Sequence, residues 1–152
     1  MKLLRQPNNW SCLLASAAMV LDKSYEELIK VLGHDGSDIL WPNLREPYCR
    51  RAFIEPEIQF LFWHYDMVLV DYVPNVLYKP MFSSVSKPIK FDISDMLKNY
   101  DGILLGEFRS GVKHAVAWNH EEGIIYDPTS CTKQPFSTFN VSHFKAKMCR
   151  TT

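Results

Sequence analysis

A single cysteine near the start of the chain stands where a catalytic thiol would be placed. Cys12 is followed by a segment, residues 13–21, in which only Ser16 is polar. A segment that is apolar on every side predicts a helix buried all round. The N-terminus of a helix carries partial positive charge, which favours a thiolate over a thiol. The sequence therefore predicts a buried helix that begins with a reactive thiol.

A catalytic thiol needs a base, and His114 and Asp127 are the candidates for the base and its orienting partner. They lie in two consecutive strand-forming segments. If Trp118 stands opposite Gly123 in an antiparallel hairpin, His114 stands opposite Asp127, with Cβ atoms roughly 5 Å apart. The carboxylate could then bind one imidazole nitrogen and leave the other for the thiol. A slip of one residue would put the two side chains on opposite faces.

Two polar residues just before the cysteine complete the candidate site. Gln6 precedes a turn-prone Pro-Asn-Asn run, so its amide could fold back beside the sulfur of Cys12. Ser11 is expected to be the N-cap of the helix, with its side chain bound to an amide of the first turn.

These residues resemble the papain-like cysteine peptidase superfamily. The pattern is a Gln, five residues and a Cys that opens a buried helix, followed later by a His on one strand and an Asp on the next. The nearest resemblance is to small proteins similar to the peptidases that cut double-glycine (bacteriocin-processing) leader peptides. It covers residues 1 to about 30 and 103–128.

The resemblance implies a fold and a set of roles. The fold is α+β and papain-like, with a thiol-bearing helix packed on an antiparallel meander. Cys12 would be the nucleophile, His114 the base and Asp127 the orienting residue. Gln6 and the backbone N–H of Cys12 would form the oxyanion hole. The implied function is a thiol hydrolase that cleaves a peptide or isopeptide bond.

The residues that flank the cysteine keep other functions open. Ser11 and Leu13 differ from the residues that the leader-peptide peptidases and the papain-type enzymes place there. A catalytically inactive fold that acts as a protein-binding module is therefore an alternative. So is an acyl transferase that uses the same three residues and passes the acyl group to an amine.

Hydrophobic periodicity and Gly and Pro residues delimit the elements that must position the site. Ser24 and Glu27 form a capping-box pattern before a helix that Gly33 stops, and Pro56 opens a third helix. The further predicted elements are the strand 67–73, a short helix capped by Asp92 and reaching Tyr100, and the strands 103–108, 113–119 and 123–127. Helices first and a meander afterwards indicate an α+β fold.

The remaining segments are predicted to be mostly irregular. Residues 34–54 form either one wall of a cleft or a surface loop with Trp41 in the core, and residues 74–88 form a connection with three prolines. Residues 129–135 are expected to be a loop, and the last fifteen or so residues a strand or a short helix.

Composition limits the class of protein. The chain has 152 residues, which predicts one domain, and its 17 basic and 17 acidic residues give no net charge. Nucleic acid and an anionic membrane are therefore not expected partners; a peptide or protein substrate is, and the oligomeric state stays open. A basic, apolar start resembles a signal peptide, but the polar residues 6–11 interrupt it.

The cysteines favour a reducing compartment. No pair among Cys12, Cys49, Cys131 and Cys149 has the CxxC spacing of a zinc or redox site. We expect four reduced thiols in a cytoplasmic protein that needs no cofactor and no metal. A zinc site that uses the last three cysteines and a histidine stays open without support from the spacing. The other histidines are expected to be ordinary surface or core residues: His34, His64, His120 and His143.

Overall fold

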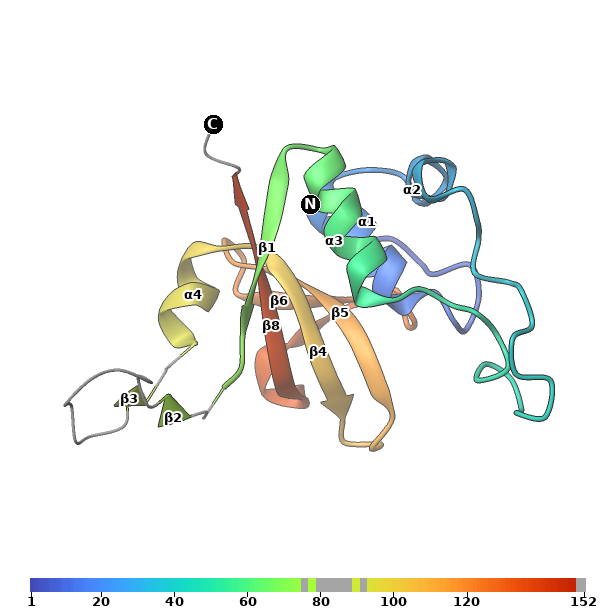
Figure 1. Ribbon diagram of the computed structural model, residues 1–152. Helices are drawn as coiled ribbons and strands as arrows, with labels where there is room; N and C mark the ends of the chain where they lie inside the picture. The colour runs from blue at the N-terminus through green and yellow to red at the C-terminus, as the bar shows by residue number, and fades with distance from the viewer. Residues whose placement is uncertain (75–76, 79–88, 91–92, 150–152) are drawn as a thin grey trace.

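The computed structural model describes residues 1–74, 77–78, 89–90 and 93–149, which form a mixed α+β fold with an N-terminal helix (Figure 1). A six-stranded antiparallel sheet has the strand order β1-β8-β4-β5-β6-β7. The helices are α1 (Cys12–Leu21), α2 (Tyr25–Leu32), α3 (Glu55–His64) and α4 (Ser94–Asn99). The sheet strands are β1 (Met67–Tyr72), β4 (Gly102–Phe108), β5 (Lys113–Asn119), β6 (Ile124–Asp127), β7 (Thr132–Pro135) and β8 (Phe139–Cys149). The short strands β2 (Leu77–Tyr78) and β3 (Ile89–Lys90) pair with each other.

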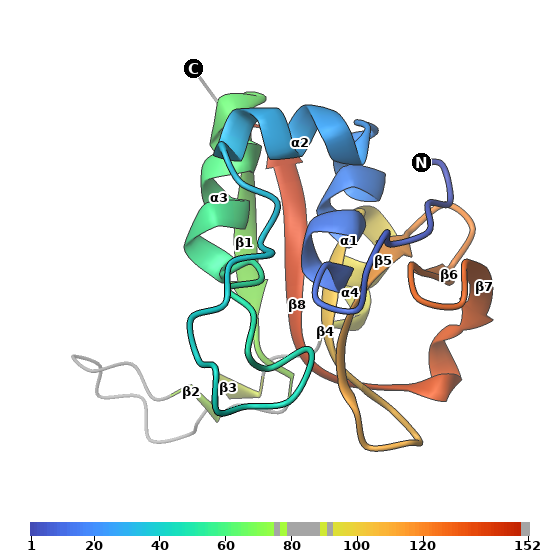
Figure 2. The same ribbon diagram turned by 90° about the vertical axis from the view of Figure 1, so that its right-hand side faces the viewer.

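Helices lie on both faces of the sheet (Figures 1 and 2). Ala115 and Ala117 of β5 belong to the core that contains α1, α2 and α3. Val116 and Trp118, which alternate with them, belong to a second core that contains α4. The indole of Trp118 donates to the carbonyl of Leu97 in α4 at 2.8 Å. Alternation along one strand therefore supplies apolar contacts to both layers.

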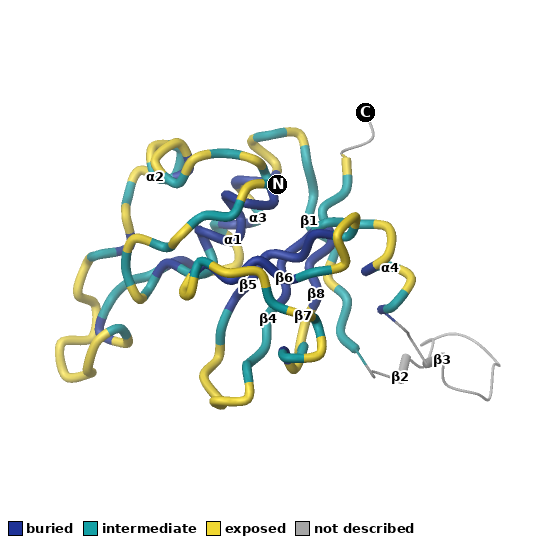
Figure 3. The backbone as a smooth tube through the Cα atoms, turned by 180° about the vertical axis from the view of Figure 1, so that it is seen from behind, coloured by how far each residue is buried: buried dark blue, intermediate teal, exposed yellow. Residues whose placement is uncertain are grey.

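The first helix is buried as its sequence predicts. Every residue from Leu14 to Val20 is buried, and most of α1 is dark blue in Figure 3. The single polar residue in this segment, Ser16, donates to the backbone carbonyl of Ala115 at 3.1 Å. That bond satisfies a buried hydroxyl and fixes α1 against β5.

One detail of the first helix was wrongly predicted. Ser11 occupies the N-cap position, but its side chain makes no capping hydrogen bond. Its hydroxyl donates to the carbonyl of Asn8 at 3.1 Å, inside the turn that precedes the helix. Ser11 therefore holds the turn closed and does not satisfy a first-turn amide.

The second helix has the predicted boundaries, and the third begins where it was predicted to begin. Ser24 and Glu27 form a reciprocal capping box, and Gly33 ends α2 with φ of 78°. Helix α3 begins at Glu55 with Pro in its first turn. Its buried side chains are Ile58, Leu61 and Phe62.

The sheet contains more than the predicted meander. The segment after β6 is not all loop, because Thr132–Pro135 forms strand β7. The C-terminal segment forms the long strand β8, which lies between β1 and β4. The register of the β5–β6 hairpin also differs from the prediction, since Trp118 pairs with Ile125 and not with Gly123.

Two predictions concern segments outside the described residues. Most of the connection 74–88 lies there, and so does Asp92, the expected cap of α4. In the described part, α4 follows Ile93 and has no side-chain cap.

The 34–54 loop is attached to the segment that precedes Cys12. The indole of Trp10 donates to the carbonyl of Asp35 at 3.2 Å, and the guanidinium of Arg50 lies 5.0 Å from the centre of that ring system. Trp41 is 51% exposed, so the alternative that put this tryptophan in the core was wrong. The last residues of the loop, at Phe53 and Ile54, line the cavity described below.

Candidate active site

The thiol of Cys12 lies at the first position of α1 in an environment that favours its ionised form. Burial raises the pKa of the thiol because it removes water from the anion. The hydrogen bond and charge of His114 and the backbone N–H groups of Ala115 and Leu13 outweigh this effect, and the pKa lies below its ordinary value. A lowered pKa is the property expected of a nucleophilic cysteine.

His114 and Asp127 form a direct hydrogen bond. Nε2 of His114 lies 2.8 Å from Oδ1 of Asp127, and the two side chains are only 12% and 9% exposed. Burial alone would lower the pKa of the imidazole, but the bonds to Asp127 and Cys12 raise it to about 9. Since Nε2 is engaged with Asp127, Nδ1 is the nitrogen left for the thiol.

The carboxylate of Asp127 is held by the turn that follows β6. Oδ1 accepts from the backbone N–H of Thr129 at 2.9 Å, and Oδ2 accepts from the hydroxyl of Ser130 at 2.6 Å. Burial raises the pKa of this carboxyl, yet His114 and these donors lower it to about 2. Asp127 is therefore ionised and fixed in orientation before any substrate binds.

The hairpin reaches this geometry by a register different from the predicted one. Ala117 pairs with Tyr126 at the end of the ladder, and one further step in the same register puts Asp127 opposite Val116 and diagonal to His114. The shift from the predicted register is two residues, and a two-residue shift leaves each side chain on its original face. The predicted contact is present for this reason, although the predicted pairing was wrong.

Gln6 lies beside the pair, connected to it through Thr129. Its Oε1 accepts from the hydroxyl of Thr129 at 3.0 Å, and its Nε2 donates to the carbonyl of Asn8 at 2.8 Å. Its backbone N–H donates to the carbonyl of Pro128 at 2.9 Å. An amide nitrogen carries two hydrogens, and the Asn8 bond uses one of them.

A cavity of about 870 Å³ opens beside the thiol and the imidazole. Its size falls within the range of small-molecule and peptide pockets. Leu13, Phe53, Leu105 and Val141 give it apolar walls, and Cys12 and His114 are part of its lining.

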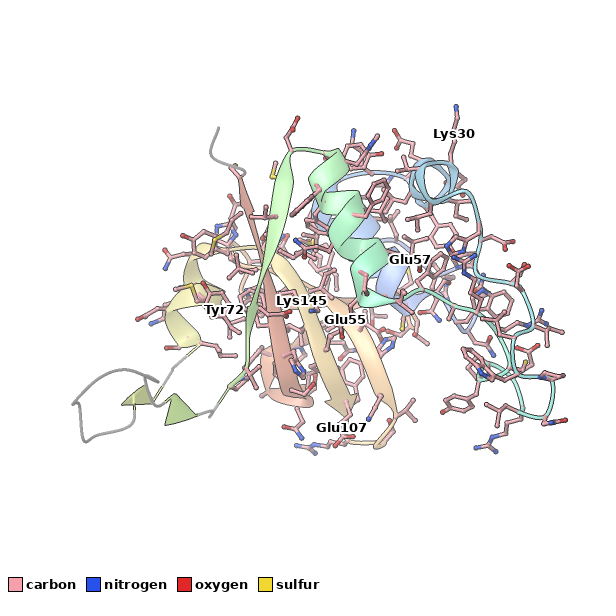
Figure 4. The ribbon with its side chains drawn as sticks, viewed as in Figure 1. Lys30, Glu55, Glu57, Tyr72, Glu107 and Lys145 are labelled. Atoms are coloured by element: carbon pink, nitrogen blue, oxygen red, sulfur yellow. The ribbon has the colours of Figure 1, made fainter. Side chains whose placement is uncertain are left out.

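Charged groups also contribute to this cavity. Glu55 and Glu107 are among its lining residues. Figure 4 shows Glu55 beside Lys145 of β8, and Glu107 near the end of β4. The ammonium of Lys145, nearly buried, binds Glu55 at 2.7 Å and Asp71 at 2.7 Å. One carboxylate of the cavity is thus paired with a cation.

Two histidines outside the site have carboxylate partners that the sequence did not indicate. His34 lies 2.9 Å from Glu57, and His120 lies 2.8 Å from Asp101. Neither contact includes a nucleophile. Among the described residues no group of three or more His, Cys, Asp or Glu side chains could hold a metal ion, and all four cysteines are free thiols.

Sequence reasoning missed the residues that surround the orienting carboxylate. Thr129 and Ser130 bind it, and the side chain of Arg5 donates to the carbonyls of both at 3.3 Å. The sequence does contain a signal for the contact with Thr129. Asp-Pro-Thr-Ser is a turn sequence in which the Asp side chain binds the backbone N–H two residues later.

Comparisons with known proteins add no family to these observations. The chain matches no protein-family model, no curated protein and no solved structure. In the part of the chain that the structure describes, every helix is too short or too polar to span a lipid bilayer.

Proposed function

We propose that the chain is a papain-like cysteine hydrolase that cleaves a peptide or isopeptide bond. The observation that carries this proposal is the shared imidazole: Nε2 of His114 is bound to Asp127 at 2.8 Å, and the imidazole lines the same cavity as Cys12 and lowers the pKa of its thiol. A thiol, a base and an orienting carboxylate in that order form the arrangement needed for nucleophilic catalysis.

The reaction follows from these groups. The thiolate of Cys12 attacks the substrate carbonyl carbon, and the negative charge that develops on oxygen is stabilised by the N–H of Cys12 and the free amide hydrogen of Gln6. His114, charged at this stage, gives its proton to the leaving amine, which departs as a thioester forms. His114 then takes a proton from water, whose oxygen attacks the thioester and releases the acid and the thiolate.

The cavity supports a substrate with side chains on the acyl side of the scissile bond. Its apolar walls, including Leu13 and Phe53, begin at the reacting sulfur. Transfer to an amine in place of water would make the protein an acyl transferase with the same residues.

The proposal is tested by profiling the purified chain against a peptide library, with Cys12→Ala as the control. We expect cleavage that the substitution abolishes, and a thioester on Cys12 that mass spectrometry detects after rapid acid quench. The proposal fails if the two proteins are indistinguishable and iodoacetamide modifies Cys12 no faster than Cys49, Cys131 or Cys149. That outcome would favour a binding module.

A further inference from the structure

The hydroxyl of Thr129 lies between the two halves of the proposed machinery. Its Oγ1 is 3.0 Å from Oε1 of Gln6, the proposed oxyanion donor, and 3.2 Å from Nε2 of His114, the proposed base. Thr129 was not predicted to be functional from the sequence, and it has no role in the reaction proposed above.

The hydrogen atoms can be assigned from the partners. The carbonyl of Asn8 can only accept, so the end of the Gln6 amide that faces it is the nitrogen, and the end that faces Thr129 is the oxygen. A threonine hydroxyl has one hydrogen and two lone pairs. That hydrogen is donated to Gln6, and the oxygen of Thr129 faces the Nε2–H of His114, whose shorter bond goes to Asp127.

The backbone of Thr129 is fixed independently of its hydroxyl. Its N–H donates to Asp127, and its carbonyl accepts from the guanidinium of Arg5. The adjacent peptide accepts from the N–H of Gln6 through Pro128. The hydroxyl can therefore be removed without releasing the turn.

We infer that Thr129 is a positioning residue that couples the oxyanion donor to the base. Its donated hydrogen turns Gln6 so that the amide nitrogen, and not the oxygen, faces the reacting carbonyl. Its oxygen makes only the longer contact to the Nε2–H that Asp127 already binds, so Asp127 still sets the imidazole form when the Thr129 hydroxyl is removed. This inference rests on the proposed function, because it concerns the same reaction.

Two chemical probes separate the effects on the thiolate and on the oxyanion hole. Alkylation of Cys12 by iodoacetamide requires a thiolate but creates no oxyanion. Acylation by 4-nitrophenyl acetate requires the thiolate and also creates an oxyanion that must be stabilised. Its rate is measured from the release of nitrophenolate. The ratio of the two rates reports the oxyanion hole without knowledge of the natural substrate.

The variants are Thr129→Val, which keeps the branched shape, and Thr129→Ser, which keeps the hydroxyl. We expect Thr129→Val to slow acylation by about tenfold or more while alkylation at neutral pH stays within about twofold. Thr129→Ser should restore at least half of the acylation rate. Thr138→Val is the matched control, because its hydroxyl binds the carbonyl of Pro135, a group outside the proposed machinery, and both of its rates should equal the wild-type rates.

A double-mutant cycle gives the decisive comparison. If Thr129 acts through Gln6, Thr129→Val should have almost no effect on acylation in a Gln6→Ala background. The inference is overturned if the effects of the two substitutions on the acylation rate multiply. It is also overturned if Thr129→Val lowers the rates of alkylation and acylation equally, or if it lowers neither rate. Failure of the proposed function has a different signature, in which the wild-type Cys12 reacts with neither probe faster than the other three cysteines.

Discussion

The hydroxyl of Ser130 donates to Oδ2 of Asp127 at 2.6 Å, on the oxygen opposite the one that binds His114. A carboxylate bound on both oxygens cannot rotate about its Cβ–Cγ bond without losing a donor. Charge-assisted bonds of this kind are short and strong. Asp127 therefore presents one fixed oxygen to the imidazole, and several predictions depend on that orientation.

The rate of Cys12 alkylation should depend on pH through a thiolate–imidazolium pair. The rate should rise as the thiol ionises below its ordinary pKa, and a further change should appear near pH 9, where His114 loses its proton. Asp127→Ala should move this second change to lower pH, and Asp127→Asn should move it less, because an amide oxygen still accepts from the ring. Alkylation rates measured from pH 4 to 10 in these variants and in His114→Ala check the prediction. The pair is absent if all four proteins titrate with one midpoint near about 8.5.

The ionised form of Asp127 should stabilise the fold in a defined pH range. Folding lowers the pKa of this carboxyl from 3.8 to about 2, so the stabilisation is complete above pH 3.8 and is lost as the pH falls through 2. The corresponding free energy is about 2 kcal/mol. Urea unfolding of the wild type and of Asp127→Asn should differ by about this amount at pH 6 and by much less at pH 2. A difference that does not change with pH would contradict the prediction.

Loss of the Gln6 side chain should affect the chemical step and not the thiol. Gln6→Ala should leave the fold intact and lower kcat by about a hundredfold, as removal of one oxyanion donor does. The alkylation rate of Cys12 should be nearly unchanged, because Gln6 does not contribute to the lowered pKa of that thiol. If the substitution abolishes alkylation, Gln6 has a structural role and its assignment is wrong.

Gly106 should tolerate no side chain, since it lies where two strands approach each other beside the cavity. A Cβ atom there would lie 2.0 Å from the carbonyl oxygen of Asn140, at a β-bulge between β4 and β8. Gly106→Ala should lower the free energy of unfolding by about 3 kcal/mol or more. The matched control is Gly111→Ala, which has φ of +74° but open space around it and should cost about 1 to 2 kcal/mol. Equal losses in urea unfolding would contradict the steric argument.

Local signals in the sequence were enough to predict most helices and strands. The capping box at Ser24, the Pro at the start of α3 and the apolar run of α1 each depend on neighbours within a few residues. The contact between His114 and Asp127 was predicted because it requires only that the two side chains share a face, which the wrong register also gave.

Long-range features could not be predicted in the same way. The position of β8 between β1 and β4 depends on pairings with residues 67–72 and 102–108, and no local pattern in the strand specifies its partners. Ser11 was assigned a capping bond that competes with a turn bond to Asn8, and the turn bond formed. Thr129 was missed because its hydroxyl binds Gln6, which lies at the opposite end of the chain.

The place of β8 in the sheet also determines when the sheet can be completed during synthesis. Strands β1 and β4 have no direct pairing with each other, and β8, the last strand of the chain, joins them. A nascent chain that ends before residue 139 already contains Cys12, His114 and Asp127 but lacks the strand that completes the sheet beneath them. Non-local pairing of this kind forms late. The β1–β8–β4 part of the sheet therefore forms only after residue 139 has been synthesised, when Cys12, His114 and Asp127 are already in the chain.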